Sequence, residues 1–549
     1  MKKLITSLSC ALVLSLSANS DLPITHENFK VSLSWLEEKP KSYAKDFFII
    51  QYLKQNIIAS DAKTAYDMAR NKNGRVKKEF NKKFQDLPSE DLKCYRAKTN
   101  DLLKYDDRCL ALGLSLYDST TLSQKKLNSV IQRVEKYPTL RNDLKVIASD
   151  QPFFSLLSTE PHRFYRLFFK AGKAFRRNEI NHPIPSSFID KISKDKKFNR
   201  FTRYVVTNPR LVNLQKSLFK VANNKELTHQ TLFFLAINAI KYDKDEVSLS
   251  YLKDAYKKAY FQMDKDKVNF WRYLITKDNS FLTPLLESWD NNIYSLYAKE
   301  ISNTKSTSIE YDIDLLNKET SFDSLSQFDW IDVVRDTKKD LSEEKLNKYH
   351  NLFSNEEFLP QYTFVLERYK KYKTQYFITP FKDVFKKYDL DKQILMYSIG
   401  RQESRFIPSS VSTATAQGIM QIMPFLSKAL AKQLKEPYNI YHQFIPEVNI
   451  KYASKHLNTL KKQFKNNPLF IAYAYNGGPG YTRKQFKNGL FKTLDKKYEP
   501  FLSMELISYN ETRRYGKKVL ANYYVYNNHM NKENSVKLSS IFQTLVAPK

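Results

Sequence analysis

Apolar residues recur every three or four positions through most of the first 300 residues of the chain. The pattern is clearest in HQTLFFLAINAIKY (229–242), SLSYLKDAYKKAYFQM (248–263) and PLLESWDNNIYSLYAKE (284–300), with polar breaks such as KYDKDE (241–246) and TKDNS (276–280) near their ends. This spacing predicts amphipathic helices, and the breaks predict turns. The sequence lacks alternating apolar segments with hairpin turns, so we expect an all-α fold.

The pattern changes along the chain, and 549 residues are too many for a single core. Many short helices without a strict repeat predict a helical solenoid over residues 21–305. The polar stretch ISNTKSTSIEYD (301–312) predicts a boundary, followed by a small helical linker domain over residues 306–373. Seven of the ten glycines follow position 399, so shaped loops are expected in a third domain, residues 374–549.

The N-terminus, MKKLITSLSCALVLSLSANSDLP, has two lysines, an apolar run and small residues before Asp21. This layout predicts a signal peptide over residues 1–20 and export as a soluble protein. A lipid anchor at Cys10 is the weaker alternative, because Leu8 stands where a small residue is expected. No later stretch has the roughly 20 apolar residues of a membrane span, so no transmembrane segment is expected in the mature chain.

Two cysteines, Cys94 and Cys109, remain after removal of the signal peptide. In an exported chain they are expected to pair as a disulfide. The alternative is two buried free thiols.

The formal net charge is +32. Such a charge implies an anionic partner, and export favours the cell wall or a membrane surface over nucleic acid. The alternative is compositional, because the whole chain is rich in Lys, Asn, Ile, Phe and Tyr.

The segment DLDKQILMYSIGRQESRFIP (389–408) predicts one helix that runs into a loop. Asp389 or Asp391 can cap its first turn, and Pro408 stops its continuation. Glu403 then lies at the carboxyl end of the helix, where the dipole disfavours negative charge. That place suits a carboxylic acid that has to hold its proton. Taken alone, however, the residue is better explained as a surface glutamate beside two arginines.

Four motifs in order change this interpretation. They are ESRFIP (403–408), AQGIMQIMP (416–424), AYNGGPG (474–480) and SYNETRRYGKKVLANYYVY (508–526). Together they resemble the catalytic domain of the soluble lytic transglycosylases, whose fold is similar to goose-type lysozyme. The resemblance covers roughly residues 375–549 by motif. It extends more loosely to the rest, because large family members carry a ring of short helices and a linker domain before the catalytic domain.

The sequence departs from the family pattern at two positions. Thr415 stands where glycine is usual, and Gly477 stands where alanine is usual. We therefore expect the loop around Thr415 to differ in shape.

The resemblance implies a peptidoglycan lytic transglycosylase, which cleaves the β-1,4 bond between N-acetylmuramic acid and N-acetylglucosamine. Glu403 would protonate the leaving oxygen and then take a proton from the C6 hydroxyl, which attacks C1 and forms a 1,6-anhydro product without water. Hydrolysing glycosidases generally need a second carboxylate, yet no Asp or Glu lies between Ser404 and Lys435. No cofactor or metal is implied.

The same resemblance implies a set of substrate-binding residues. Tyr475 is expected to hydrogen-bond near Glu403 or the sugar, and Asn476 to fix the loop that presents it. Gln421 is expected to contact an N-acetyl or hydroxyl group, and Met423 to supply an apolar wall. The other members are Ser404, Gly418 and Glu511, of which Glu511 is equally well explained as a structural partner of Arg513 or Arg514.

The expected partners are peptidoglycan glycan strands, which the basic helical region would hold, and cell-wall synthesis proteins. Nucleic acid is not expected, and the expected location is the periplasm. Two other functions stay open. One is a hydrolytic muramidase with Glu447, Asp495 or Glu499 as second carboxylate, and the other is a non-catalytic scaffold that binds the cell wall.

Overall fold

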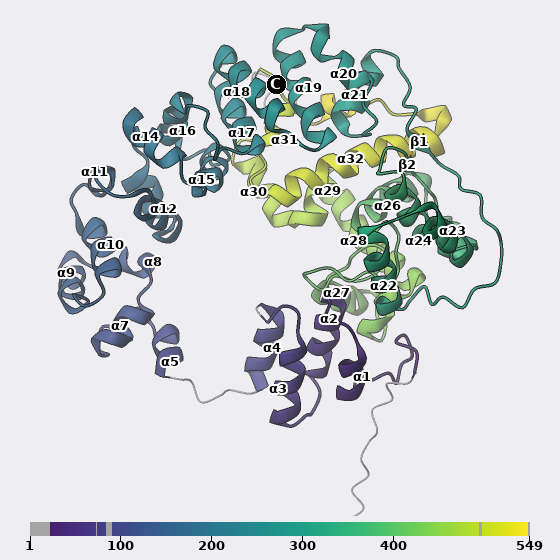
Figure 1. The fold of residues 1–549 in the computed structure, drawn as a ribbon, viewed down its shortest axis with the longest axis horizontal. Coiled ribbons are helices and arrows are strands. Elements are labelled where there is room, and N and C mark those ends of the chain that lie inside the picture. The colour runs from purple at the N-terminus through teal and green to yellow at the C-terminus, as the bar shows by residue number, and fades with distance from the viewer. Residues whose placement is uncertain (1–21, 73, 84–89, 493–496, 547–549) are drawn as a thin grey trace, which may run out of the picture. The chain divides into compact units, whose positions relative to one another are not determined.

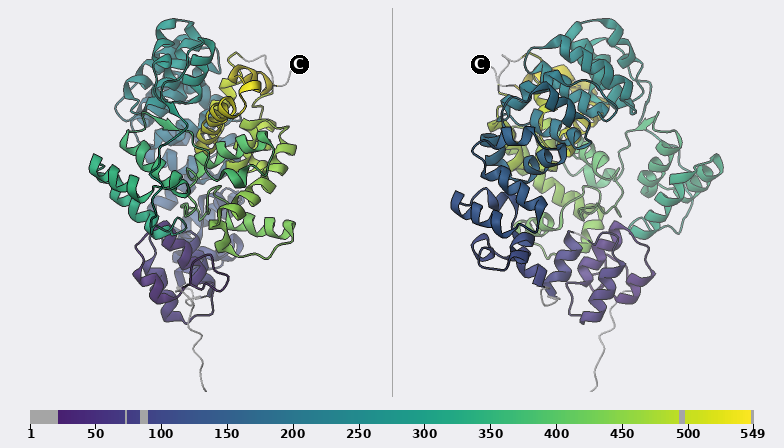
Figure 2. Two further views of the ribbon diagram at one scale, coloured as in Figure 1. Left: turned by 90° about the vertical axis from the view of Figure 1, so that its right-hand side faces the viewer. Right: turned by 60° about the vertical axis from the view of Figure 1, so that its left-hand side comes forward.

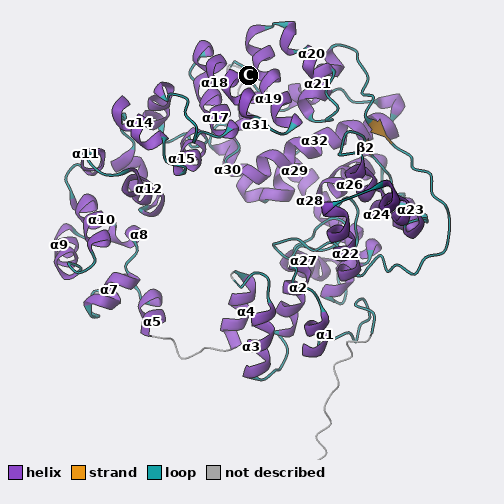
Figure 3. Ribbon diagram, in the orientation of Figure 1, coloured by secondary structure: helices purple, strands orange, loops and turns teal. Residues whose placement is uncertain are grey.

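The computed structural model describes residues 22–72, 74–83, 90–492 and 497–546, and within these ranges the fold is all-α, as the apolar spacing predicts (Figure 3). The one sheet of the described ranges is a parallel pair of two-residue strands, β1 (Ile309–Glu310) and β2 (Gln375–Tyr376). The predicted signal peptide, Cys10 and Asp495 lie outside the described residues. None of the helices in these ranges is long and apolar enough to cross a membrane.

The chain divides into two compact units, and each combines segments that are far apart in the sequence. Among the described residues, the first unit contains 22–72, 74–83, 315–361 and 403–453, and the second contains 90–314, 362–402, 454–492 and 497–546. These units do not follow the expected domain boundaries after residues 305 and 373, which stay a prediction.

The helices of the first unit are α1 (Leu33–Glu38), α2 (Tyr43–Tyr52), α3 (Ala59–Met68), α4 (Arg75–Lys83), α22 (Gln327–Lys339), α23 (Glu343–Leu352), η4 (Glu356–Phe358), α27 (Pro424–Leu434) and η5 (Ile440–Phe444). Three further helices contain residues of both units: α24 (Leu359–Tyr369), α26 (Leu390–Glu403) and α28 (Pro446–Gln463).

The second unit contains the longer series of helices (Figure 1): α5 (Glu90–Arg96), α6 (Thr99–Leu102), α7 (Asp107–Gly113), α8 (Leu116–Ser119), α9 (Gln124–Arg133), α10 (Pro138–Ala148), α11 (Pro152–Leu157), α12 (Pro161–Lys170), α13 (Gly172–Phe175), η1 (Arg176–Ile180), α14 (Ser186–Ser193), α15 (Lys197–Val206), α16 (Val212–Ser217), η2 (Leu218–Lys220), α17 (His229–Ile240), α18 (Asp245–Lys258), α19 (Gln262–Thr276), η3 (Asn279–Phe281), α20 (Thr283–Leu286), α21 (Ile293–Ile301), α25 (Lys382–Phe385), α29 (Pro468–Gly477), α30 (Pro479–Lys487), α31 (Phe501–Leu506), α32 (Asn510–Met530), η6 (Lys532–Asn534) and α33 (Leu538–Thr544).

Aromatic side chains from all three segments form the core of the first unit. Phe48 of α2 stacks on Tyr441 with ring centroids 6.1 Å apart and packs against Phe328 at 5.8 Å. Phe47 contacts Phe444 edge-on at 5.8 Å, and all five rings are buried. Buried aromatic pairs contribute about 0.5–1.5 kcal/mol beyond their area. The N-terminal helices therefore share one core with the chain that follows Glu403.

In the second unit, helices that are neighbours in sequence pack on one another, as the helical pattern predicts; α17 lies against α18 and α9 against α10 (Figures 1 and 2). The long helix α32 lies against α29. A Cβ atom added to Gly516 of α32 would lie 2.2 Å from the ring of Tyr473 of α29, which is fully buried. Glycine at 516 thus lets the two helices approach.

Two segments that the apolar spacing predicts as continuous helices are interrupted. In 248–263 the chain leaves the helix at Ala259, which is extended, and starts α19 after Phe261. In 284–300, α20 ends at Leu286 and Asn292 caps α21 by accepting from the N–H groups of Tyr294 and Ser295. In the first segment, the apolar spacing continues through Tyr260 and Phe261, but these side chains are 85% and 60% exposed. In the second segment, the side-chain cap competes with continuation of the helix.

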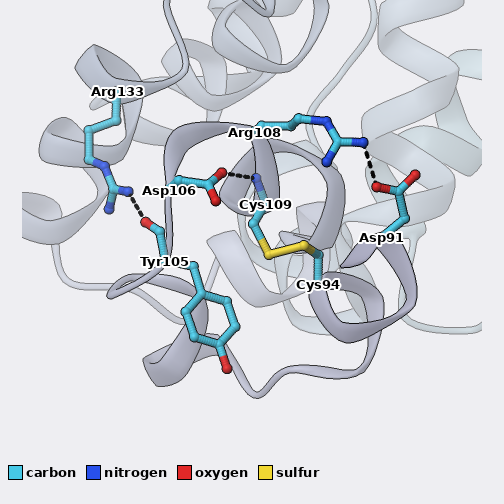
Figure 4. The surroundings of a disulfide bond; sticks show 7 residues. All are labelled: Asp91, Cys94, Tyr105, Asp106, Arg108, Cys109 and Arg133. Atoms are coloured by element: carbon cyan, nitrogen blue, oxygen red, sulfur yellow. Dashed lines mark hydrogen bonds and ion pairs between the residues drawn. A yellow bond between two sulfur atoms is a disulfide. The ribbon is translucent and has the colours of Figure 1, made fainter. Parts of the chain in front are cut away.

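A disulfide joins Cys94 of α5 to Cys109 of α7 (Figure 4). The carboxylate of Asp106 caps α7 by accepting from the Cys109 N–H at 2.7 Å. The Arg108 guanidinium donates to Asp91 at 2.6 Å, which adds a second link between the same two helices. Two helices of seven residues are thereby held together at the start of the second unit.

A buried carboxylate ties α19 to the start of α21. Asp266 accepts from the Ser288 hydroxyl at 2.6 Å, the Asn292 amide at 2.7 Å and the Gln262 amide at 2.8 Å. Burial raises the pKa of Asp266 to about 7, because removing a carboxylate from water disfavours its charged form.

Candidate active site

Helix α26 carries Glu403 at its last position, as its sequence predicts. Asp389 caps the first turn by accepting from the Lys392 N–H at 2.8 Å. The middle of the helix, from Ile394 to Gly400, is buried, and Asn522 of α32 donates to the carbonyl of Ser398 at 3.0 Å. The helix is therefore fixed along its length, and Glu403 is half-buried where it ends.

Two residues in the left-handed conformation, Arg405 and Phe406, turn the chain away after α26, with φ of 57° and 66°. The hydroxyl of Ser404 donates to the carbonyl of Ile419 at 2.8 Å, which fastens this turn to the following loop. Ser404 therefore supports the backbone directly behind Glu403.

The loop from residue 409 to 423 folds on itself through backbone hydrogen bonds. The Gln417 N–H donates to the carbonyl of Ile422, and the Ile422 N–H donates back to the carbonyl of Gln417, both at 3.1 Å. Asn449 of α28 is fully buried beneath it, accepting from the Met420 N–H at 2.7 Å and donating to the Gln417 carbonyl at 3.1 Å. Sequence reasoning did not single out Asn449, because no local signal marks an asparagine inside a helix as the support of a loop.

Gly418 is required for this loop to close. Its φ is +74°, and an added Cβ would lie 2.2 Å from the carbonyl oxygen of Gln443 and 2.7 Å from the Asn449 amide nitrogen. Gln421 is half-buried, and its amide donates to the carbonyls of Gly418 at 2.9 Å and Ser410 at 3.2 Å. Met423 is the N-cap residue of α27 and is half-buried. The segment 416–424 thus stabilises the loop through contacts of its own residues.

Thr415, where glycine was expected from the family pattern, adopts the left-handed conformation with φ of 62°. Its hydroxyl accepts from the Arg75 guanidinium at 2.6 Å, and the same nitrogen donates to the Ala414 carbonyl at 2.7 Å. Arg75 is the first residue of α4, 340 positions earlier in the chain. The N-terminal helices therefore contact the loop directly.

The second group of predicted residues lies on α29 and α32. Tyr475 is half-buried beside the ring of His456, with centroids 5.6 Å apart. Burial lowers the pKa of His456 from its ordinary value. A neutral imidazole next to Tyr475 is a candidate site residue that sequence reasoning missed, since a single histidine in a helix carries no signal.

Asn476 and Glu511 contact each other across the two helices. The Asn476 amide donates to Glu511 at 3.4 Å, and its carbonyl oxygen accepts from the Thr512 hydroxyl at 2.7 Å. Glu511 is exposed. The Arg513 guanidinium donates to the Ile507 carbonyl at 2.8 Å and to the Asn510 side chain at 2.5 Å.

The candidate residues fall in two groups. Glu403, Ser404, Gly418, Gln421 and Met423 belong to the first compact unit, and Tyr475, Asn476 and Glu511 to the second. Within the part of the chain that the structure describes, no three His, Cys, Asp or Glu side chains form a group that could hold a metal ion.

Residues 380–498 match the family model of the transglycosylase SLT domain. The soluble lytic murein transglycosylase of Escherichia coli K12 is 36% identical over 146 residues, which cover 26% of this chain and 22% of that protein. The protein of the same description from Salmonella typhimurium is 33% identical over 168 residues, covering 30% and 25%. This chain thus matches about a quarter of the length of these relatives.

Two solved structures align with more of the chain. An inactive mutant of a lytic transglycosylase from Pseudomonas aeruginosa aligns over 91% of this chain and 84% of its own, with 14% identity and a TM-score of 0.44. The 70-kDa soluble lytic transglycosylase of Escherichia coli aligns over 91% and 83%, with 17% identity and a TM-score of 0.37.

The sequence similarity to these relatives includes the residues that match the family model. Glu403 and Tyr475 both lie inside residues 380–498. Through these residues, this chain is similar to the transglycosylase SLT domain and to the soluble lytic murein transglycosylases of Escherichia coli and Salmonella typhimurium.

Proposed function

We propose that this chain is a peptidoglycan lytic transglycosylase that cleaves the β-1,4 bond between N-acetylmuramic acid and N-acetylglucosamine and forms 1,6-anhydro-N-acetylmuramic acid. The observation that carries the proposal is the position of Glu403. It ends a capped, buried helix inside the residues that match the transglycosylase SLT domain.

The proposed reaction uses one carboxylic acid twice. Glu403 gives its proton to the glycosidic oxygen as the bond from C1 to that oxygen breaks. It then takes the proton of the C6 hydroxyl as the bond from O6 to C1 forms, so the protein ends in its starting state and no water is consumed. The end of α26 favours the protonated starting state, because the helix dipole is negative there.

The places of two other carboxylates support a single-acid mechanism over hydrolysis. Glu499 accepts from the N–H of Ser503 at 3.1 Å and from its hydroxyl at 2.9 Å, and so caps α31. Glu447 lies in the first turn of α28, where a negative charge stabilises the helix. Both residues therefore have structural reasons to be acidic.

Roles follow for the residues around the loop. The side-chain NH2 group of Gln421 donates to loop carbonyls, so its side-chain oxygen is the atom that accepts from an N-acetyl N–H or a sugar hydroxyl. Met423 supplies an apolar wall, while Ser404 and Gly418 hold the backbone behind Glu403. On α29 and α32, Tyr475 hydrogen-bonds near Glu403 or the sugar. Asn476 fixes the loop that presents Tyr475, and Glu511 is a further substrate-binding residue.

The remaining parts of the proposal concern location and partners. The chain is exported to the periplasm, where its basic helical region retains glycan strands through their peptide carboxylates, and cell-wall synthesis proteins are further partners. Retention by charge should weaken as salt is added. Binding of the mature protein to sacculi that is unchanged between low and high salt would exclude charge as the mechanism.

The test of the reaction is the mass of its products. Purified sacculi are digested with the mature protein, with Glu403→Gln and with Glu447→Gln, which makes the same chemical change at the start of α28. We expect muropeptides one water lighter than their hydrolysed counterparts from the wild type and from Glu447→Gln, and none from Glu403→Gln. Reducing-end products would mean hydrolysis. Bound sacculi without products from any of the three proteins would mean a scaffold.

A further inference from the structure

The second unit contains a cavity of about 140 Å³ between α17, α19, α21, α31 and α32. One part of its wall is apolar and aromatic, with Phe233, Phe234 and Phe261 among its residues. The rest is densely charged: five Lys or Arg residues line it against two carboxylates, which leaves three positive charges. None of these residues belongs to the candidate active site described above.

The two carboxylates are already neutralised by their neighbours. Asp264 accepts from Lys267 at 2.8 Å and from His229 at 3.0 Å. Glu505 accepts from Lys517 at 2.7 Å on each oxygen, and the hydroxyl of Tyr294 donates to it as well. Lys267 and Lys517 therefore pair with the two carboxylates of the lining, and Arg513 and Arg514 of α32 add further positive charge to it.

Arg513 carries that excess into the interior. Its side chain is buried, its two hydrogen bonds go to neutral oxygens, and its guanidinium lies 4.7 Å from the ring centroid of Phe234. The charge of Glu505 acts on Arg513, but this carboxylate is hydrogen-bonded to Lys517, and a buried cation without a direct ion pair is costly. Burial lowers the pKa of Arg513 to about 10 and that of Lys517 to about 8, so positive charge is under-compensated at the cavity wall.

Neutral polar groups complete the lining. The Gln230 amide donates to the Asn510 side-chain oxygen at 3.1 Å, and Arg513 donates to the same oxygen. Arg514 and Lys518, both exposed, lie one turn apart at the edge of the lining. The cavity thus combines amides, cations and aromatic rings within a small volume.

We propose that this cavity binds a small organic carboxylate, with the carboxylate at the cations of α32 and a short apolar part against Phe233 and Phe261. Guanidinium groups suit carboxylates because their N–H groups form parallel hydrogen bonds. The apolar wall disfavours a fully hydrated inorganic anion. The source of the ligand rests on the proposed function: it is the terminal carboxylate of a peptidoglycan peptide, bound at a site separate from the one that carries Glu403.

The test is a calorimetric titration of the full mature chain with N-acetyl-D-alanyl-D-alanine and with its C-terminal amide. The amide keeps the shape of the ligand and removes its charge, so we expect its affinity to be at least tenfold lower. Inorganic phosphate is titrated as a third probe. Equal affinity for the carboxylate and the amide, or phosphate binding as tight as the peptide, would overturn the assignment.

Three variants locate the binding. Arg514→Gln removes an exposed cation of the lining and should weaken binding several-fold, whereas Lys253→Gln removes an exposed cation of α18 outside the lining and should not. Met263→Trp fills the cavity without changing its charge and should abolish binding. Unchanged binding in both Arg514→Gln and Met263→Trp would show that the ligand binds elsewhere.

The inference and the proposed function fail separately. If the wild-type protein binds the carboxylate but forms no 1,6-anhydro products, the proposed reaction is refuted. The proposed source of the ligand is refuted with it, and the cavity remains a carboxylate site. Normal products from wild-type protein that does not bind the dipeptide would refute only the cavity site.

Discussion

Replacing Arg75 by methionine is expected to loosen the loop that follows Glu403, although the two residues are more than 300 positions apart. Arg75 donates from one nitrogen to the carbonyl of Ala414 and to the hydroxyl of Thr415. The substitution removes both hydrogen bonds and keeps an unbranched side chain of similar length. Its effect therefore measures what the contact contributes to the loop.

The magnitude follows from two opposing terms at Thr415. A branched residue with φ of 62° is strained by about 1–2 kcal/mol relative to glycine. A hydrogen bond to a charged donor contributes about 1.5–3 kcal/mol when shielded, and we expect about 1 kcal/mol here because the Arg75 side chain is exposed. Thr415→Gly removes both terms, so by itself it should change loop stability little.

The two substitutions should not be additive. Where Arg75 is intact, Thr415→Gly loses the hydrogen bond while it relieves the strain. In the Arg75→Met background there is no bond to lose, so the same change should stabilise the loop by about 1 kcal/mol more. A difference of that size corresponds to about a fivefold change in the constant for local opening.

The assay is hydrogen exchange, followed by mass spectrometry, of peptides that cover residues 408–420. Local opening is the appropriate quantity because it does not require the whole chain to unfold in one step. Arg75→Met removes both hydrogen bonds and should speed exchange of these amides at least fivefold, and Lys78→Met, an exposed cation on the same helix, should leave it unchanged. If Thr415→Gly alters exchange by the same factor in both backgrounds, the Arg75–Thr415 bond does not hold the loop.

Three further predictions concern stability. The pKa of Asp266 is raised from 3.8 to about 7, so the folded state binds a proton that the unfolded state has lost between these values and stability falls as pH rises through that window; about three units correspond to about 4 kcal/mol. Asp266→Asn should remove this fall. Thermal unfolding of the wild type and of Asp266→Asn at pH 4 and pH 8 should show that the variant gains stability relative to the wild type at pH 8. A stability difference that does not depend on pH would contradict the assigned cause. Gly516→Ala should destabilise the protein by about 1–3 kcal/mol because its Cβ meets the ring of Tyr473. Gly480→Ala, with open space around it, should be neutral or slightly stabilising. Equal denaturation midpoints for the two variants would show that α29 and α32 can move apart at little cost in free energy. Reducing the disulfide between α5 and α7, which closes a loop of 15 residues, should cost about 3 kcal/mol in the chain-entropy model, seen as faster hydrogen exchange in α5 and α7 but not in α17.

The sequence predicts those parts of the structure that depend on short-range signals. Asp389 caps α26 and the chain turns away after Glu403, and both features are marked by residues a few positions apart. The helical content follows for the same reason, because amphipathic spacing records only which side of a segment is buried. Where exposed aromatic residues continue that spacing, as at Tyr260 and Phe261, the pattern cannot reveal that the helix has ended.

The parts that could not be predicted depend on partners far away in the chain. The contact of Arg75 with Thr415, the support that Asn449 gives to Met420 and the cavity between α17 and α32 all join distant segments. The charges around Glu505 give no periodic signal, since a buried ion pair and a solvated one have the same letters in the sequence. Only the three-dimensional arrangement shows which cations are matched.

This distinction changes how the motif around Gly418 is interpreted. From the sequence, Gly418 and Gln421 were expected to contact the glycan, yet Gly418 is required by its neighbours Gln443 and Asn449, and the Gln421 amide is engaged within the loop. Substitutions there would misplace the loop, whatever their direct role in binding. Glu403→Gln differs in kind, because it changes the acid and keeps the size and shape of the side chain. A variant that loses product while hydrogen exchange in the 408–420 loop is unchanged would therefore identify a residue that takes part in the reaction. A variant that loses product while exchange becomes faster would identify a residue that supports the loop.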